Sequence, residues 1–404
     1  MSRELWTDAY LEQMRHVADP EADAVVADVF AQRQLGELNA FIGSLSGLSG
    51  LPASLPPEIR DFVVRNAARP NWVQDMHLRR AENYFTRHGL GAMLALVCAS
   101  LPECYTMRKG VRILALTRQL GAHIDRRLHQ TALMVLAVMQ PNGLDLGGPG
   151  VIEAQKVRLL HAAIRRLILL GVTPAQASAN LGAAPSSIAQ AMAREGFKWD
   201  LQQDGQPVNQ EDLAFTLLTF GYIIPLAMSR FGVQASDDER TAFLHTWNLT
   251  GAYLGVRREL MADTPDDAAY LYERIKARQA GATLDGAFLT NRLLNFMEKD
   301  VLRVPVLRPL APIMVRVLAG NDTARLLGID TRHSAGVRLF QRTVVRLVRA
   351  INRAVRFLGR FHPLSALGTV MGRETIQFLY RYSSEREGTV RLAIPTDWIG
   401  APRR

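Results

Sequence analysis

Cysteine is almost absent from this chain, and its scarcity excludes several kinds of site. Cys98 and Cys104 are the only two cysteines among 404 residues, with five residues between them. This spacing matches neither a CxxC redox pair nor a CxxCH motif for covalent haem attachment. Two cysteines are also too few for a disulfide scaffold, and they fit a reducing compartment.

Other sequence signals are missing as well. Residues 1–16 carry early acids and no apolar segment, so they do not form a secretory leader. We therefore expect a cytoplasmic or peripheral membrane protein, or a secreted one if a leader has been removed. No HExxH motif or comparable pair of histidines has the spacing of a zinc site.

Uninterrupted apolar runs of membrane-spanning length are lacking too. Residues 90–101 are apolar and free of charge but too short to cross a bilayer, so we expect a buried helix there. The run 213–229 is nearer to spanning length, but Gly221 and Pro225 interrupt it. A buried, kinked core helix that begins at a cap on Asn209 is the better prediction.

Helical periodicity is present over most of the chain. Hydrophobic residues make up 48% of it, and few stretches show the alternation of apolar and polar residues that is typical of strands. The sequence predicts an all-α fold. We expect one large helical domain (58–330), with an N-terminal arm (1–57) and a C-terminal helical extension (331–404).

The net charge is +10, and the excess of positive charge is arginine. Between Arg342 and Arg360, arginines recur every three or four residues beside an apolar stripe, which predicts an amphipathic helix with a basic face. That face is either solvated, docked on an anionic membrane surface, or in contact with nucleic acid. Few aromatic residues are interleaved for base stacking, so nucleic acid is the least favoured partner.

Residues 171–196 have the outline of a helix-turn-helix. The segment that would contact bases offers only Arg194 besides small polar groups. Base readout normally uses several long polar side chains at the start of the reading helix. We expect a surface helical hairpin rather than a DNA-binding motif.

Two helical segments at the centre of the chain, 126–139 and 152–170, carry the strongest indication of a site. One apolar stripe is predicted on the second segment by residues at steps of three and four: Val157, Leu160, Ile164 and Ile168. His161 lies on that stripe. A buried imidazole opposite a helix with a short polar entrance is the arrangement that a haem site needs.

The first segment supplies that polar entrance. Arg127, Gln130 and Thr131 share the start of a helical face that becomes apolar further along. A structural interpretation remains open for all of these residues. His161 would then be a hydrogen-bonded core residue, Arg127 a cation reaching for solvent, and Thr131 a residue bonded back to its own helix.

Three sequence runs carry a resemblance to a known family. The run VRLLHAAIR (157–165) is preceded by RRLHQT (126–131) and followed by WDLQQDGQPVNQEDLAFTLLTF (199–220). Together they resemble the latex clearing protein (rubber oxygenase) family, which also includes a fungal membrane-bound oxygenase of mycophenolic acid biosynthesis. The resemblance covers roughly residues 90–263, with weaker likeness as far as residue 330.

The resemblance implies a helical fold with a globin-like core that holds non-covalent haem b. It assigns His161 as the proximal iron ligand and places Arg127 and Thr131 on the distal side. Gln130 departs from the family, since rubber-cleaving members have a lysine there. They also carry a glutamate on the preceding segment, whereas residues 105–120 contain no acid. These departures concern the substrate rather than haem binding.

Further residues are expected around the cofactor. Arg158 and Arg165 lie one turn on either side of His161 and are candidates to pair with haem propionates. Apolar side chains are expected to line the haem: Leu160, Leu217 and Phe220. His245 is the second candidate for the iron ligand, although a hydrogen-bonded core histidine is the better prediction for it.

The leading hypothesis is a haem b-dependent oxygenase of the dioxygenase type that acts on an apolar, unsaturated isoprenoid with dioxygen, polyisoprene being one candidate. If the family reaction carries over, a C=C bond is cleaved to carbonyl ends. The alternative is a haem- or lipid-binding protein at the membrane surface without turnover. A DNA-binding regulator acting through residues 171–196 is the third hypothesis.

Overall fold

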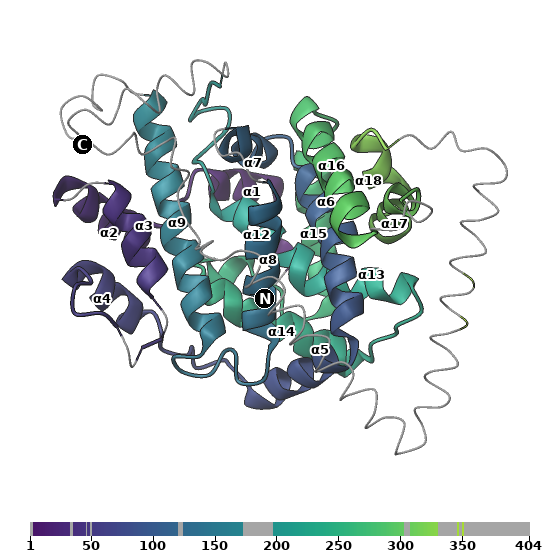
Figure 1. Cartoon of the computed structure of the whole chain (residues 1–404), viewed down its shortest axis with the longest axis horizontal. Helices are drawn as coiled ribbons and strands as arrows, with labels where there is room; N and C mark the ends of the chain where they lie inside the picture. The colour runs from purple at the N-terminus through teal and green to yellow at the C-terminus, as the bar shows by residue number, and fades with distance from the viewer. Residues whose placement is uncertain are drawn as a thin grey trace.

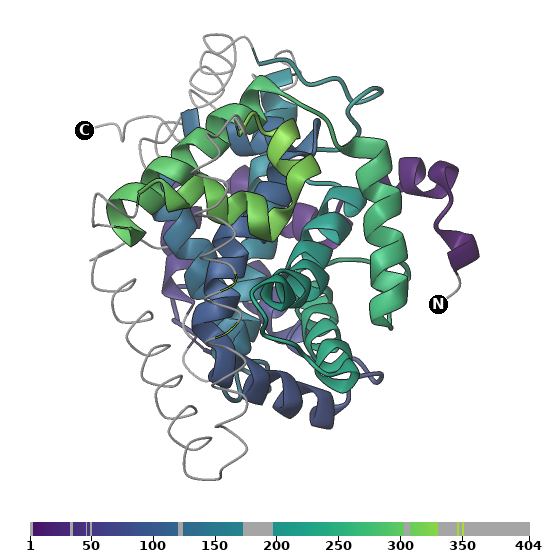
Figure 2. The same cartoon turned by 90° about the vertical axis from the view of Figure 1, so that its right-hand side faces the viewer.

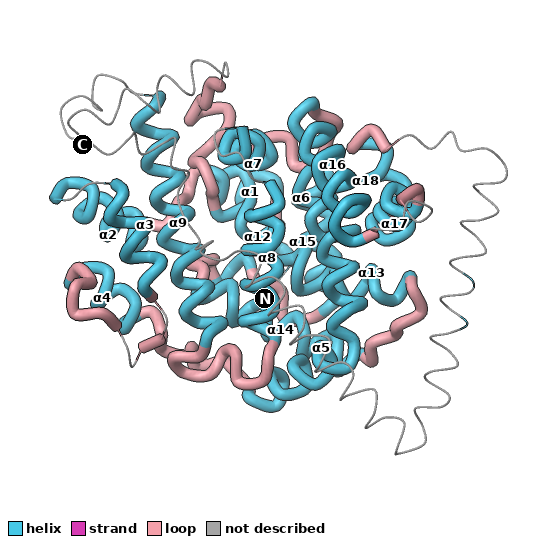
Figure 3. The backbone as a smooth tube through the Cα atoms, in the orientation of Figure 1, coloured by secondary structure: helices cyan, strands magenta, loops and turns pink. Residues whose placement is uncertain are grey.

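The computed structural model describes residues 3–32, 35–45, 47–48, 51–119, 124–172, 197–302 and 308–329, together with residues 346 and 350. In these ranges every regular element is a helix, and Figure 3 draws no strand. The one β-type contact described is an isolated antiparallel bridge between Met107 and Ala280. The predicted all-α fold is confirmed.

The helices follow one another with short connections. The N-terminal arm holds α1 (Asp8–Arg15), α2 (Pro20–Gln32), α3 (Leu35–Ser44) and α4 (Pro57–Arg65). The central part holds α5 (Asp75–Ala95), α6 (Leu101–Tyr105), α7 (Gly110–Gln119), α8 (Ile124–Met139) and α9 (Pro149–Val172). The remainder holds α12 (Gln210–Leu218), α13 (Ile224–Arg230), α14 (Asp237–Tyr253), α15 (Pro265–Gln279), α16 (Leu284–Phe296), α17 (Leu310–Ala319) and α18 (Asn321–Leu326). Short 3₁₀ turns are η1 (Arg3–Leu5) and η4 (Arg258–Leu260), and π-helical turns are η2 (Leu96–Ser100), η3 (Thr219–Ile223) and η5 (Met297–Val301).

Several helices begin where their capping residues predict. Ser236 and Glu239 form a reciprocal capping box at the start of α14. The Thr264 hydroxyl accepts a hydrogen bond from the backbone of Asp267 at the start of α15, and Pro57 opens α4. These contacts satisfy backbone N–H groups that have no partner inside the first helical turn.

The long apolar segment Gln210–Arg230 is interrupted as expected, but by a different device. A π-helical turn, η3, lies between α12 and α13 and includes Gly221. A Cβ added at Gly221 would lie 3.0 Å from Cβ of Trp247, so glycine allows α14 to pack closely here. Of the described helices, this segment alone is long and apolar enough to cross a membrane, and 72% of its apolar window is buried inside the protein. It is a core helix of this fold.

Apolar side chains collect in two clusters that meet at α9. The larger core is formed mainly by α5–α8 and α12–α18, and the smaller core by α2–α4 together with α7 and α9. In Figure 1, α9 stands between the N-terminal helices α2–α4 on its left and the other helices on its right. The arm is therefore packed on one side of α9 while the larger core occupies the other.

This position of α9 corrects the predicted single stripe. Val157 packs against the larger core, whereas Leu160, Ile164 and Ile168 belong to or pack against the smaller one. A helix buried on two sides has apolar residues at more than one angular position, so a three-and-four spacing cannot say which core each residue joins.

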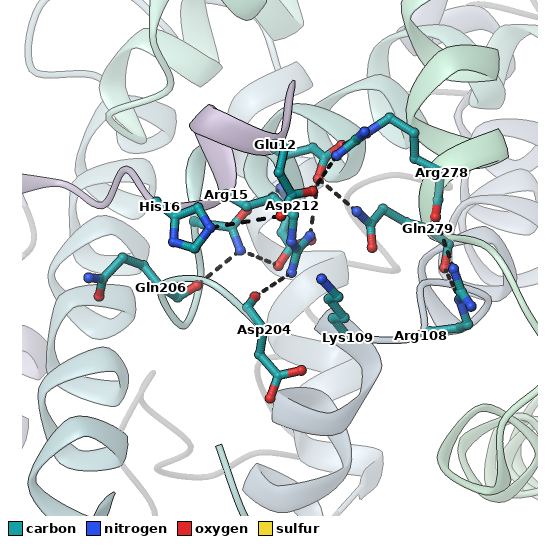
Figure 4. A network of polar contacts seen from close by, with 12 residues as sticks. Glu12, Arg15, His16, Arg108, Lys109, Asp204, Gln206, Asp212, Arg278 and Gln279 are labelled. Atoms are coloured by element: carbon teal, nitrogen blue, oxygen red, sulfur yellow. Dashed lines mark hydrogen bonds and ion pairs between the residues drawn. The ribbon is translucent and has the colours of Figure 1, made fainter. Parts of the chain in front are cut away.

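A buried ionic network ties α1 to the start of α12 and the end of α15 (Figure 4). Arg15 is fully buried and donates to Glu211 at 3.1 Å, to Asp212 at 2.9 Å and to the backbone carbonyl of Asp204 at 2.7 Å. Arg278 of α15 donates to the second oxygen of Glu211 at 2.9 Å. Figure 2 shows the N-terminal residues lying beside the rest of the fold on this side.

Two sequence predictions concern residues outside the described ranges. The helical hairpin expected at residues 171–196 is described only for its first two backbone positions, which end α9. The basic stripe between Arg342 and Arg360 is likewise outside them, apart from Arg346. Both remain predictions.

Candidate functional site

The helical hairpin α8–α9 carries the predicted site. Its two helices are antiparallel neighbours joined by the short loop 140–148. Gly150 sets their register, because a Cβ there would lie only 2.8 Å from Cα of Val138. Eleven residues before Val138 is Arg127, and eleven after Gly150 is His161. Equal steps along antiparallel helices bring these two backbone positions to the same level of the hairpin.

His161 projects toward the larger core. Val151 and Ala154 belong to that core and Val157 packs against it. His161 follows Val157 by four positions, so it shares their face of α9. The imidazole is partly exposed, while its Nδ1 atom is buried. The face therefore changes from purely apolar to one imidazole with access to space.

The predicted distal residues lie on the facing helix. Gln130 and Thr131 are both partly exposed residues of α8. The backbone of Arg127 is in the same helix, and its side chain is outside the described part of the chain. The structure thus brings the backbones of these residues opposite His161, and their roles at the site remain predictions.

Arg158 is engaged inside the protein rather than placed toward a cofactor. Its guanidinium group donates to Asp19 at 2.6 and 2.9 Å, to Asn66 at 2.7 Å and to Glu21 at 3.1 Å. It also lies 4.9 Å from the ring centre of Phe62. Burial works to lower the pKa of Arg158, but the carboxylates outweigh it and the pKa is raised. The guanidinium is therefore permanently charged and fully occupied.

Arg165 has a similar set of partners. Its Nε donates to both oxygens of Asp23, at 2.9 and 3.1 Å. Its Nη1 donates to the backbone carbonyls of Pro207 and Val208, at 3.1 and 2.8 Å. The expectation that Arg158 and Arg165 pair with haem propionates is corrected on this ground, because their donors already hold α2 and the segment before α12.

The three apolar residues predicted to line the cofactor fall in two places. Leu160 packs against the smaller core, on the arm side of α9. Leu217 and Phe220 are buried in the larger core, where Leu217 contacts the space left by Gly251 and Phe220 stacks on Trp247 with ring centres 4.6 Å apart. Only the last two lie on the side to which His161 projects.

His245 is a hydrogen-bonded histidine, as the sequence favoured. Its Nε2 accepts a hydrogen bond of 3.0 Å from the backbone N–H of Gln74, and Trp72 meets its ring edge-on. Burial, helped by the neighbouring charges of His77 and Arg258, lowers the pKa of His245 to about 4. The ring is neutral and its accepting nitrogen is already used, so it is not placed to bind a metal.

A buried polar cluster in the larger core was not predicted. Glu103 lies directly before the acid-free stretch 105–120 and is 2% exposed. Its oxygens contact Lys276 of α15 at 2.8 Å and Thr323 of α18 at 2.6 Å. Nearby, the Ser100 hydroxyl donates to Thr219 at 3.0 Å between the two π-helical turns η2 and η3. No local sequence signal marks these contacts, because each joins residues more than a hundred positions apart.

The donor groups are compatible with a cofactor that needs one protein ligand. Within the described ranges no three His, Cys, Asp or Glu side chains are grouped around a common metal position. A haem iron takes four nitrogens from the porphyrin, so a single imidazole suffices on the protein side. His161, on a helix face that is otherwise apolar, has that chemistry.

Comparisons with known proteins agree with this arrangement. The sequence matches the family described as ER-bound oxygenase mpaB/B'/Rubber oxygenase, catalytic domain, over residues 89–350. The rubber oxygenase of Streptomyces sp. (strain K30) is 24% identical over 327 residues, which span 78% of this chain and 71% of that protein. The solved structure of latex clearing protein LCP in the closed state superposes with a TM-score of 0.68 at 22% identity, covering 84% of each chain. The superposition shows a shared helical fold.

Proposed function

The chain belongs to the family of mpaB-type and rubber oxygenases, and from this premise we propose that it is a haem b-dependent oxygenase that cleaves C=C bonds of an apolar isoprenoid. The observation that carries the proposal is the α8–α9 hairpin. It sets the one partly exposed imidazole of an apolar helix face level with the polar start of the facing helix. Family membership supplies the oxygenase class, and the hairpin supplies the place.

The residues present fit a haem. His161 would hold the iron, since an imidazole is a common axial ligand and no second protein ligand is required. Its buried Nδ1 lies in protein surroundings that fix the orientation of the ring. Leu217 and Phe220 would give the cofactor an apolar wall on the same side of α9. When bound, haem b would supply the redox chemistry that activates dioxygen.

The chain's own side chains have separate roles in this proposal. Arg127 would place a fixed positive charge where negative charge develops, and a preorganised charge in a site without bulk water is effective there. Thr131 would orient the reacting partner through its hydroxyl group. Gln130 contributes a neutral amide, so no charged side chain at this position closes over the site.

The substrate class follows from the surroundings of the site. Leu217, Phe220 and Trp247 are buried apolar residues that would favour a hydrocarbon over a polar substrate. The rubber oxygenase relative is named for polyisoprene cleavage, which makes a polyisoprene or a shorter isoprenoid the first substrate to test.

One specific observation favours a second candidate function. Gln130 stands where rubber-cleaving relatives carry a lysine, and residues 105–120 contain no acid. A haem- or lipid-binding protein without turnover would need neither group. Its place in the cell would be the cytoplasm or a membrane surface, with the basic stripe between Arg342 and Arg360 as the contact with anionic lipid.

Oxygen consumption separates the two candidates. The holoprotein is incubated with polyisoprene or an unsaturated isoprenoid, and carbonyl products are measured by mass spectrometry. We expect consumption in proportion to new carbonyl ends. In Arg127→Ala and Thr131→Val we expect a loss of about 10²-fold in turnover with retained haem, since such groups act on developing charge. Bound haem with no oxygen consumption on any isoprenoid would support the non-catalytic candidate instead.

A further inference from the structure

His161 lies between two arginines that are anchored to the same N-terminal helix. Arg158 precedes it by three residues and Arg165 follows it by four, so both are one helical turn away. Arg158 is bound by Asp19 and Arg165 by Asp23. Asp19 is the residue before α2 and Asp23 lies in its first turn. Two turns of α9 are thus held against one turn of α2.

Both attachments are of the kind that fixes geometry. Arg158 and Asp19 form two parallel hydrogen bonds, and their side chains are only 8% and 7% exposed. The Arg165 side chain is 2% exposed, and it reaches both Asp23 and the carbonyls of Pro207 and Val208. Planar, two-pronged contacts with guanidinium groups restrict direction as well as distance. Rotation or sliding of α9 near His161 would break several of them together.

We propose that Asp19 and Asp23 are positioning residues for His161, so that the N-terminal arm holds the histidine in the orientation needed to bind haem. The inference rests on the proposed function. Asp19 and Asp23 lie outside residues 89–350, which are the part matched by the family's catalytic domain. The catalytic unit of this chain therefore includes a helix that the matched domain lacks.

The Asp23→Ala variant tests this most cleanly. Asp19 also accepts a hydrogen bond from the backbone N–H of Ala22 at the start of α2, so Asp19→Asn is used there to keep the cap. The matched control is Val29→Ala, a buried apolar residue of the same helix in the smaller core. It weakens α2 without touching either arginine. Asp23→Glu tests rescue by the conservative variant.

Two properties of the holoprotein are measured, and neither depends on turnover. One is the rate of haem loss to an excess of a haem-scavenging protein, and the other is the iron–histidine stretching band of the ferrous protein by resonance Raman spectroscopy. We expect Asp23→Ala and Asp19→Asn to lose haem about tenfold faster and to shift or broaden the band, as changes in outer partners of a metal ligand do. Val29→Ala should keep the wild-type band, and Asp23→Glu should restore it in part.

The outcomes are distinguishable. If Asp23→Ala and Asp19→Asn keep the wild-type band and rate, or if Val29→Ala alters both to the same degree, the positioning role is refuted while haem binding stands. If the wild-type protein binds no haem, or binds it equally well without His161, the proposed function and the positioning role both fail. Should Asp23→Ala fail to fold, Asp23→Asn preserves one hydrogen bond to Arg165 and gives the same readouts.

Discussion

Two histidines of similar sequence setting have opposite surroundings in the folded chain. His161 lies on an apolar helix face, partly exposed and level with polar residues of the facing helix. His245 accepts a backbone hydrogen bond and is packed among Trp72 and His77. A site for a ligand needs an imidazole with access to space, and a structural histidine needs one whose nitrogens are used. This difference assigns the first to the cofactor and the second to the fold.

The low pKa of His245 predicts a pH-dependent loss of stability. The unfolded imidazole takes up a proton near its ordinary pKa of 6.5, while the folded one does so only near 4. The unfolded state therefore binds more protons between these values, and the unfolding free energy falls as pH decreases through this interval. In His245→Gln the side-chain oxygen still accepts from Gln74 but does not titrate. Urea unfolding at several pH values should show a shallower decline in the variant, and equal slopes would refute the assignment.

The sequence located His161 but not its supports, and the reason is distance along the chain. The motif around His161 is local and was recognisable from nine consecutive residues. Arg158 and Asp19 are 139 positions apart, and Arg165 and Asp23 are 142 apart. Two arginines beside a candidate iron ligand therefore looked available for propionates, while the carboxylates that occupy them could only be found in the folded structure.

At the scale of helices, local signals predicted ends better than partners. The caps at Ser236 and Thr264 and the start at Pro57 were legible because each depends on residues within one turn. The residues 20–44 were predicted as one helix and form two, α2 and α3. The apolar stripe of α9 was predicted as one face and is shared between two cores, because burial on two sides removes the polar face that would have revealed its orientation.

The register of α8 and α9 gives a prediction about two glycines. In Gly150→Ala the new methyl group would meet the backbone of Val138 at 2.8 Å, so the hairpin must separate, at a cost of about 1–3 kcal/mol. Haem should be lost from this variant more readily, since His161 and Arg127 lose their common level. Denaturant unfolding and haem retention after gel filtration measure both effects.

Gly91→Ala is the matched control. It lies within α5, and its new methyl group would meet only the flexible end of Met228 at 3.6 Å. Alanine is the better helix former, so the variant should gain up to about 1 kcal/mol and keep its haem. A Gly150→Ala variant as stable as the wild type, with full haem retention, would show that the close approach at Val138 does not set the register.

At the scale of the whole molecule, the arm is part of the folded unit rather than an appendage. It reaches α9 through α2 and reaches α12 and α15 through Arg15 of α1 (Figure 4). α12 is the helix that leads to Leu217 and Phe220. The arm therefore touches both sides of the proposed site from behind, which the sequence could not show because Arg15 and Glu211 are 196 positions apart.

Removal of Arg15 should expose how much the molecule depends on this contact. In Arg15→Leu the carboxylate of Glu211 stays buried with fewer partners, and loss of one member of a buried pair costs about 3 kcal/mol. Burial already raises the pKa of Glu211 against the opposing effect of Arg15. Protonation of Glu211 in the folded variant should therefore make the deficit smaller as pH falls from 7 toward 4.5. The unfolding free energy is measured at both ends of that range.

Arg274→Ala serves as the control, because its contact with Asp8 joins the same two regions at the surface. An exposed pair of this kind contributes under about 1 kcal/mol. If the two variants lost equal stability, or if the deficit of Arg15→Leu grew at low pH, the buried network would not be what holds α1 in place.

The central claim is that His161 binds a haem iron, and one absorption spectrum tests it directly. The purified protein is loaded with haem, freed of excess, and compared with His161→Ala and His245→Ala treated in the same way. We expect a Soret band in the wild type and in His245→Ala, and its loss in His161→Ala. A band that persists without His161 and disappears without His245 would contradict the claim.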